Sequence, residues 1–199
     1  MSTHHEELQE IENVKHFWRN GGKWIFAALL VAALGYLAYV VYQNHRQSQN
    51  EQAATLAAQI QSGKSSDVAA LQQQYPDSMG AAQATLHTAA QAFAKGQYDE
   101  AVNGYRWVLE HQKAPLMQAA AAQNLANVYL QQKKYDEALQ AAATPVEAAF
   151  QALMDETRGD IYAAQGKADE AKKAYQAALD KTEKDSPVRE GLELKLAQL

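Results

Sequence analysis

The stretch Gly-Gln-Tyr-Asp-Glu-Ala at 96–101 decides the fold, because the chain repeats it twice. It returns as Lys-Lys-Tyr-Asp-Glu-Ala at 133–138 and as Gly-Lys-Ala-Asp-Glu-Ala at 166–171. The alanines that end the three copies, Ala101, Ala138 and Ala171, are 37 and then 33 residues apart. Each copy places an acidic pair directly after breaker residues, which is typical of the first turn of a helix. The sequence therefore predicts one helical unit that occurs three times.

Small and aromatic residues recur at matching positions around these copies. They are Ala89, Ala92, Ala101 and Tyr105 in the first unit, Leu125, Ala126, Tyr129 and Ala138 in the second, and Gly159, Tyr162, Ala171, Tyr175 and Ala178 in the third. Helices that cross closely need Ala or Gly where they touch, and aromatic side chains fill the gaps to the next hairpin. A period near 34 residues, built as two helices and a tight turn, is typical of the tetratricopeptide repeat. We predict such repeats at about 82–115, 119–152 and 152–185.

Helices are also expected on both sides of the repeats. Residues 51–75 are predicted to form a degenerate hairpin ahead of them. Ser186-Pro187 is a helix cap followed by proline at the first helical position, so 187–199 is predicted to be a terminal capping helix. The abundance of Ala, Gln, Leu, Glu and Lys favours helix, and no alternating strand pattern occurs. The predicted domain is an all-α solenoid of helical hairpins.

An apolar run near the N-terminus is long enough to cross a membrane. Residues 24–42, with the sequence WIFAALLVAALGYLAYVVY, contain no charge and span about 28 Å as a helix. Trp24 and Tyr42 lie at its two ends, as expected for interfacial anchors. Two other readings stay open: a signal peptide cleaved near 33–35, and a buried helix of a soluble protein. The predicted fold class is therefore all-α, with a single N-terminal transmembrane helix followed by a tetratricopeptide-like helical-hairpin solenoid.

The charges that flank the apolar run predict its orientation. Lys15, Arg19 and Lys23 precede it, whereas only Arg46 lies close behind it. The positive-inside rule then leaves the N-terminus in the cytoplasm. We divide the chain into a cytoplasmic tail at 1–23, a transmembrane helix at 24–42 and a domain on the opposite side at 43–199.

No sequence pattern indicates catalysis, a cofactor or nucleic-acid binding. The three acidic pairs recur at one repeat position, so we interpret them as partners of the helix macrodipole rather than catalytic groups. The six histidines make no metal-binding spacing, the chain has no cysteine, and no phosphate-binding loop occurs. A net charge of −5 with no basic face does not fit nucleic-acid binding. We predict no catalytic residue, no cofactor and no metal site, and the chain is not expected to be an enzyme.

The predicted function therefore depends on a binding surface. Stacked helical hairpins present a concave face that is lined mainly by their first helices and that binds peptides or proteins. The candidate residues are polar and lie on or near the predicted first helices. They are Gln83, His87, Gln91, Gln118, Gln123, Asn127 and Arg158.

The whole chain resembles the YfgM-like ancillary subunits of the bacterial SecYEG translocon. The most specific local match is Glu12-Asn13-Val14-Lys15-His16-Phe17-Trp18 followed by Gly22-Lys23, directly before the apolar run. The resemblance extends to the order of parts, namely a short acidic tail, one span and a tetratricopeptide-like domain. It implies a single-pass protein of the bacterial inner membrane, with the C-terminal domain in the periplasm.

The resemblance also implies partners. These are the SecYEG translocon, a PpiD-like periplasmic chaperone and exported polypeptides, which the protein would pass from the channel to chaperones. A scaffold for another cell-envelope complex, using the same face, is the alternative. A further hypothesis is that Glu6, Glu7, Glu10 and Glu12 in the tail dock a cytoplasmic regulator.

Overall fold

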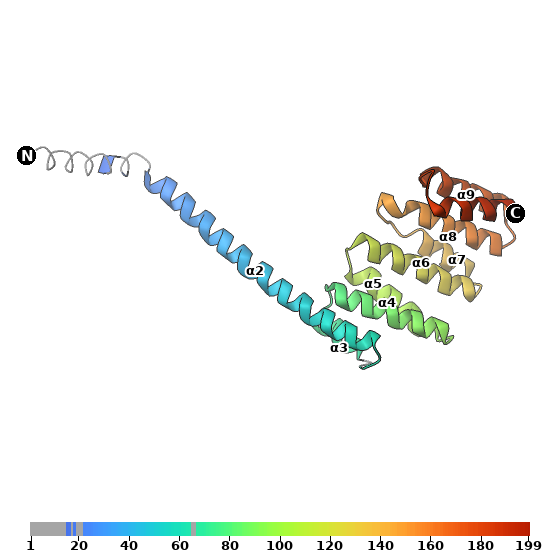
Figure 1. Ribbon diagram of the computed structural model, residues 1–199, viewed down its shortest axis with the longest axis horizontal. Coiled ribbons are helices and arrows are strands. Elements are labelled where there is room, and N and C mark those ends of the chain that lie inside the picture. The colour runs from blue at the N-terminus through green and yellow to red at the C-terminus, as the bar shows by residue number, and fades with distance from the viewer. Residues whose placement is uncertain (1–14, 17, 19–21, 65–66) are drawn as a thin grey trace, which may run out of the picture. The chain divides into compact units, whose positions relative to one another are not determined.

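A computed structural model describes residues 15, 16, 18, 22–64 and 67–199 (Figure 1). The chain divides into two compact units, Met1–Ser48 and Gln49–Leu199. Most of the predicted tail, including the acidic residues proposed to dock a regulator, lies outside the described residues. So does much of the local match before the apolar run.

The described residues form helices joined by short turns, and none of them forms a β-strand. The α-helices are α2 (Lys23–Gln61), α3 (Val68–Gln74), α4 (Met79–Ala94), α5 (Tyr98–His111), α6 (Pro115–Gln131), α7 (Tyr135–Ala142), α8 (Gln151–Ala164), α9 (Ala168–Lys181) and α10 (Pro187–Ala197). A short 3-10 helix, η2 (Ala148–Phe150), precedes α8. From α4 to α9 the helices follow one another in space in chain order (Figure 1).

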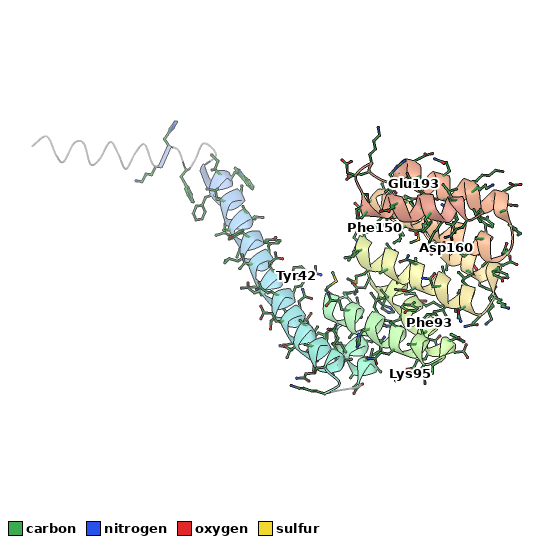
Figure 2. All side chains as sticks on the ribbon, turned by 45° about the vertical axis from the view of Figure 1, so that its right-hand side comes forward. Tyr42, Phe93, Lys95, Phe150, Asp160 and Glu193 are labelled. Atoms are coloured by element: carbon green, nitrogen blue, oxygen red, sulfur yellow. The ribbon has the colours of Figure 1, made fainter. Side chains whose placement is uncertain are left out.

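Helix α2 has 39 residues and contains an 18-residue window with a mean hydropathy of 2.2. None of that window is buried, and large apolar side chains such as Leu30 and Val31 are more than half exposed. The core helix of a soluble domain would bury them. It is the one helix in the described part of the chain that is long and apolar enough to cross a membrane. Figure 2 labels Tyr42, which ends the predicted span within this helix.

Four turns between paired helices share one hydrogen-bond pattern. In the first copy of the repeat, the Gln97 amide donates to the Ala92 carbonyl and the Gly96 amide donates to the Phe93 carbonyl, both at 2.9 Å. Such a Schellman motif needs one residue with positive φ after the helix. The residues in that position are Gly63 (φ 71°), Gly96 (75°), Lys133 (59°) and Gly166 (74°). The turn at Gly63 shows that α2 ends in the same way as α4, α6 and α8.

The helix starts follow from the sequence. Asp67, Ser78 and Ser186 accept hydrogen bonds from backbone amides at the starts of α3, α4 and α10. Helices α5, α7 and α9 have no such side-chain cap, and instead carry the acidic pairs in their first turns. The positive end of the helix dipole favours carboxylates there.

The core is built from alanines and a few large side chains. Its largest cluster joins α4 to α8 and includes Tyr105, Val128 and Ile161, all fully buried. Two helical glycines allow a close approach of their neighbours. A Cβ on Gly80 would lie 2.7 Å from the carbonyl carbon of Ala53, and one on Gly159 would lie 2.4 Å from the ring of Tyr175. These contacts hold α2 against α4 and α8 against α9.

One hairpin departs from the others. Helix α7 has 8 residues, whereas α5 and α9 have 14 each. It ends at Ala142, shortly before Pro145, which cannot donate a helical backbone hydrogen bond. The segment that follows is not helical until Ala148. The predicted all-α fold class, with one long apolar N-terminal helix ahead of helical hairpins, is confirmed.

Candidate functional site

The predicted binding residues lie on three neighbouring helices. We call the surface of α4, α6 and α8 that carries them the first-helix face. Helix α6 packs against both α4 and α8, so the three helices form one row. Gln83, His87 and Gln91 lie on α4, Gln118, Gln123 and Asn127 lie on α6, and Arg158 lies on α8.

The residues on α4 form an exposed polar strip. Gln83 and Gln91 are exposed, and His87 is half-buried. The Gln91 amide nitrogen lies 2.9 Å from Nε2 of His87, one helical turn away. This contact is local and leaves the Gln83 amide and the amide oxygen of Gln91 accessible.

Three amide side chains on α6 have unused hydrogen-bonding groups. Gln123, Asn124 and Asn127 are half-buried, and Asn127 lies about one helical turn beyond the other two. No other residue that the structure describes makes a hydrogen bond to their side chains, although each carries both donors and an acceptor. Asn124 was not among the predicted residues, and its position beside Gln123 and Asn127 is seen only in the structure.

Gln118 is engaged within the chain. Its amide nitrogen donates to the carbonyl oxygens of Leu109, at 3.2 Å, and of Gln112. Gln112 is itself buried and donates to the carbonyls of Pro76 and Ser78, both at 3.1 Å. Together these amides tie the end of α5 to the start of α6 and to the segment before α4. A structural role accounts for Gln118 without any partner.

Arg158 is paired with a buried carboxylate. Asp155, which is 3% exposed, contacts Arg158 one turn along α8 and Lys181 at the end of α9. An unpaired charge at such a buried position would be costly. Arg158 therefore neutralises Asp155 with part of its guanidinium. The sequence analysis missed Asp155, because an aspartate on a polar helix face has no local signal of burial.

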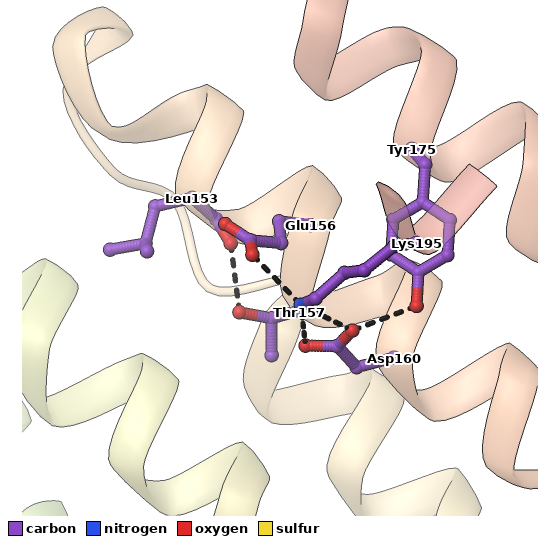
Figure 3. A network of polar contacts seen from close by, with 6 residues as sticks. All are labelled: Leu153, Glu156, Thr157, Asp160, Tyr175 and Lys195. Carbon is purple, nitrogen blue, oxygen red and sulfur yellow. Dashed lines mark hydrogen bonds and ion pairs between the residues drawn. The ribbon is translucent and has the colours of Figure 1, made fainter. Parts of the chain in front are cut away.

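A second polar network joins the terminal helix to the third hairpin (Figure 3). Nζ of Lys195 on α10 lies 2.8 Å from Glu156 and 2.7 Å from Asp160, both on α8. The Tyr175 hydroxyl on α9 donates to the same Asp160 carboxylate at 2.8 Å. Below this network, Leu192 of α10 is 1% exposed against the apolar cluster of α9. Helix α10 is thus fixed by both apolar and charged contacts, and the sequence analysis did not predict the charged ones.

The network changes the acidity of two of its members. Burial raises the pKa of the Tyr175 phenol, and the hydrogen bond to Asp160 raises it further. Burial acts to lower the pKa of Lys195, but its hydrogen bonds to Asp160 and Glu156 outweigh burial, so that this pKa lies above its usual value. Both groups therefore keep their protons at any physiological pH.

The acidic pairs lie along the turns, on exposed first turns of successive second helices. A shallow depression of about 620 Å³ between the first two of these turns is lined by Tyr98, Asp99 and Glu100 and by Gln132 and Lys134. Among the described residues, no three His, Asp or Glu side chains are grouped closely enough to hold a metal ion.

Comparison with known proteins agrees with this architecture. The family described as "Tetratricopeptide repeat-like domain" matches residues 15–199. A protein of Neisseria gonorrhoeae named "Ancillary SecYEG translocon subunit" is 52% identical over the full length of both chains. Proteins with the same name from Haemophilus influenzae and Aggregatibacter actinomycetemcomitans are 26% and 24% identical, over 87% of this chain and 88% of theirs. No solved structure matches the chain significantly.

The family match covers the apolar part of α2 as well as every hairpin, and the relative from Neisseria gonorrhoeae matches the chain from end to end. The predicted resemblance is confirmed. The chain belongs to the family of ancillary SecYEG translocon subunits, which carry a tetratricopeptide repeat-like domain.

Proposed function

We propose that this chain is a single-pass protein of the bacterial inner membrane that associates with the SecYEG translocon and binds other polypeptides through its first-helix face. The observation that carries the proposal is the 52% identity to a named translocon subunit along the entire chain. An identity that covers both the apolar helix and the domain supports the same attachment and the same kind of partner.

The continuity of α2 supports a mechanism. One helix includes the apolar window and also Ala53, Ala57 and Ile60, which are buried in the domain. The apolar window and these buried residues therefore belong to one helix. A domain anchored beside a channel meets an emerging chain at a high effective concentration, so each individual contact needs little affinity. The unused amides of Gln123 and Asn127 are suited to such weak, general contacts.

In this proposal the N-terminus is cytoplasmic and the domain is periplasmic, as the positive-inside rule indicates. The domain receives exported polypeptides and passes them to a PpiD-like periplasmic chaperone. The acidic tail contacts a cytoplasmic regulator. Deletion of residues 2–12 without any change in captured cytoplasmic partners would remove this last part of the proposal.

Photo-crosslinking in cells tests the first-helix face. A photoreactive amino acid is placed at His87 or Gln123, and in matched controls at Asn103 or Lys172, exposed residues of α5 and α9. Adducts of the first pair with SecYEG subunits, a periplasmic chaperone or exported chains are expected, with much weaker adducts from the controls. Adducts with wall-synthesis or secretion enzymes alone would reject translocon association in favour of a scaffold for another envelope complex.

A further inference from the structure

A groove lies between α5 and α7, away from the first-helix face. Its volume is about 370 Å³, and its lining includes Arg106, Leu109 and Glu110 of α5, Leu125 and Tyr129 of α6, and Glu137 of α7. Leu125 and Tyr129 each lie two residues beyond Gln123 and Asn127, which is about 200° around the helix. The groove and the predicted face are therefore on different sides of α6.

The groove follows the short second helix of the middle hairpin and the end of α5. Helix α5 continues for 14 residues, whereas α7 ends after 8, and Thr144 beyond its end also lines the groove. Arg106, Leu109 and Glu110 belong to the second half of α5, and Glu137, Gln140 and Ala141 of α7 line the same groove. The second half of α5 and most of α7 thus form the two walls, with Leu125 and Tyr129 of α6 between them.

The groove combines an apolar floor with unbalanced charge. Leu125 and Tyr129 are nearly buried, and Leu109 is half-buried. The Arg106 guanidinium donates to the Tyr129 hydroxyl at 2.8 Å, which holds its charge at one place in the wall. Glu110 and Glu137 are exposed on opposite walls, and neither forms an ion pair with another residue that the structure describes. Two carboxylates thus face a single guanidinium.

We infer that this groove binds an extended segment of another polypeptide in which a bulky apolar side chain is flanked by Lys or Arg. The volume lies at the lower end of the range of ligand pockets, about 300–1,000 Å³, and suits one large apolar side chain with its neighbouring backbone. The apolar side chain packs on Leu125 and Leu109. The flanking cations pair with Glu110 and Glu137, whose charge is otherwise unmatched. This binding goes beyond the proposed function, because it uses a different surface and specifies the sequence that is bound.

The test is peptide binding to the full chain in detergent micelles or nanodiscs, followed by fluorescence anisotropy. The probe is the labelled peptide Gly-Ser-Lys-Leu-Lys-Ser-Gly. The two control peptides replace both lysines by Glu or the leucine by Ser. We expect each control to bind at least about tenfold more weakly, and binding of the probe to weaken as salt is raised. Equal binding of the Lys and Glu peptides would overturn the inference.

Matched variants place the binding on the molecule. The double change Glu110→Gln with Glu137→Gln is expected to weaken binding of the probe about three- to tenfold. The control, Asp169→Asn with Glu170→Gln, removes the same amount of charge from the first turn of α9 and should leave binding unchanged. Thr144→Trp, which places a large side chain at the groove, should also weaken binding, and circular dichroism checks that each variant is folded.

Two results would reject the groove. One is a loss of binding in the control that equals the loss in the Glu110/Glu137 variant, because the attraction would then be general. The other is binding that resists the groove variants but is lost on Gln123→Ala, because the peptide would then occupy the first-helix face. Neither result affects association with the translocon, which the crosslinking experiment tests separately.

Discussion

The second and third hairpins have similar turn sequences between their two helices, yet they differ in how completely they are covered by neighbouring elements. In the third, Gly159 faces Tyr175, α9 has 14 residues, and α10 is fixed on top through Lys195. In the second, Ala126 and Ala142 occupy the corresponding positions, α7 has 8 residues, and a non-helical segment follows. The repeated turn sets the hairpin, whereas the packing around it decides whether a groove remains.

The largest effect is expected where the third hairpin is tightest. Gly159→Ala places a Cβ 2.4 Å from the Tyr175 ring, so it should lower the free energy of unfolding by about 2–3 kcal/mol. Urea unfolding of the full chain in detergent, followed by circular dichroism, measures it. The double variant with Tyr175→Ala should lose much less than the sum of the two single changes, because the clash is gone. Simple additivity would contradict this account of the pair.

The charged contacts of α10 come next. Lys195→Met removes hydrogen bonds to Glu156 and Asp160, which are half-buried, and is expected to cost about 1–2 kcal/mol. Glu193→Gln on the same helix removes an exposed pair with Arg189 and should cost at most about 0.5 kcal/mol. Equal losses in the same unfolding experiment would mean that the network adds nothing beyond ordinary surface pairs.

The same network predicts a pH dependence on the alkaline side. The folded pKa values of Tyr175 and Lys195 lie above their ordinary values of 10.0 and 10.5. Above pH 10 the unfolded chain therefore loses these protons before the folded chain does, so stability falls as pH rises. Melting temperatures measured from pH 8 to 11 should drop more steeply for the native chain than for Tyr175→Phe. Parallel curves would argue against a perturbed phenol.

The smallest effect concerns the turns themselves. Lys133 adopts φ 59° where the other copies have glycine, and a side chain in that conformation costs about 1 kcal/mol. Lys133→Gly should therefore raise the free energy of unfolding of the full chain by roughly that amount. Gly166→Lys in the third hairpin should lower it by a similar amount. If neither change alters the urea midpoint, the turns do not limit stability.

Much of the fold was predictable because its signals are local. The repeated turn, the acidic pairs and Ser186-Pro187 each act within about one helical turn. The apolar run is recognised from its length and its lack of charge alone. Each of these signals reports a structure that forms among neighbouring residues. The division into three repeats and the seven binding residues stays a prediction, since the geometry alone does not show what they bind.

The site was less predictable, because burial and pairing depend on residues far apart in the chain. Gln118 was predicted to be a binding residue. Its side-chain amide donates hydrogen bonds to the carbonyls of Leu109 and Gln112, and these bonds become visible only when α5 and α6 are packed together. Pro145 was a local signal that α7 would end early, but the groove beside α7 is lined by residues of three helices, α5, α6 and α7.

The sequence by itself therefore determined the membrane-length helix, the helical hairpins and their turns, since hydropathy and backbone conformation are properties of short segments. Tertiary structure alone decided that Asp155 is buried between Arg158 and Lys181, and that Lys195 reaches Asp160 from 35 residues away. It also decided that a groove remains between α5 and α7. The physical reason is that a charge or a cavity is defined by every element packed around it, and no window of the sequence contains them all.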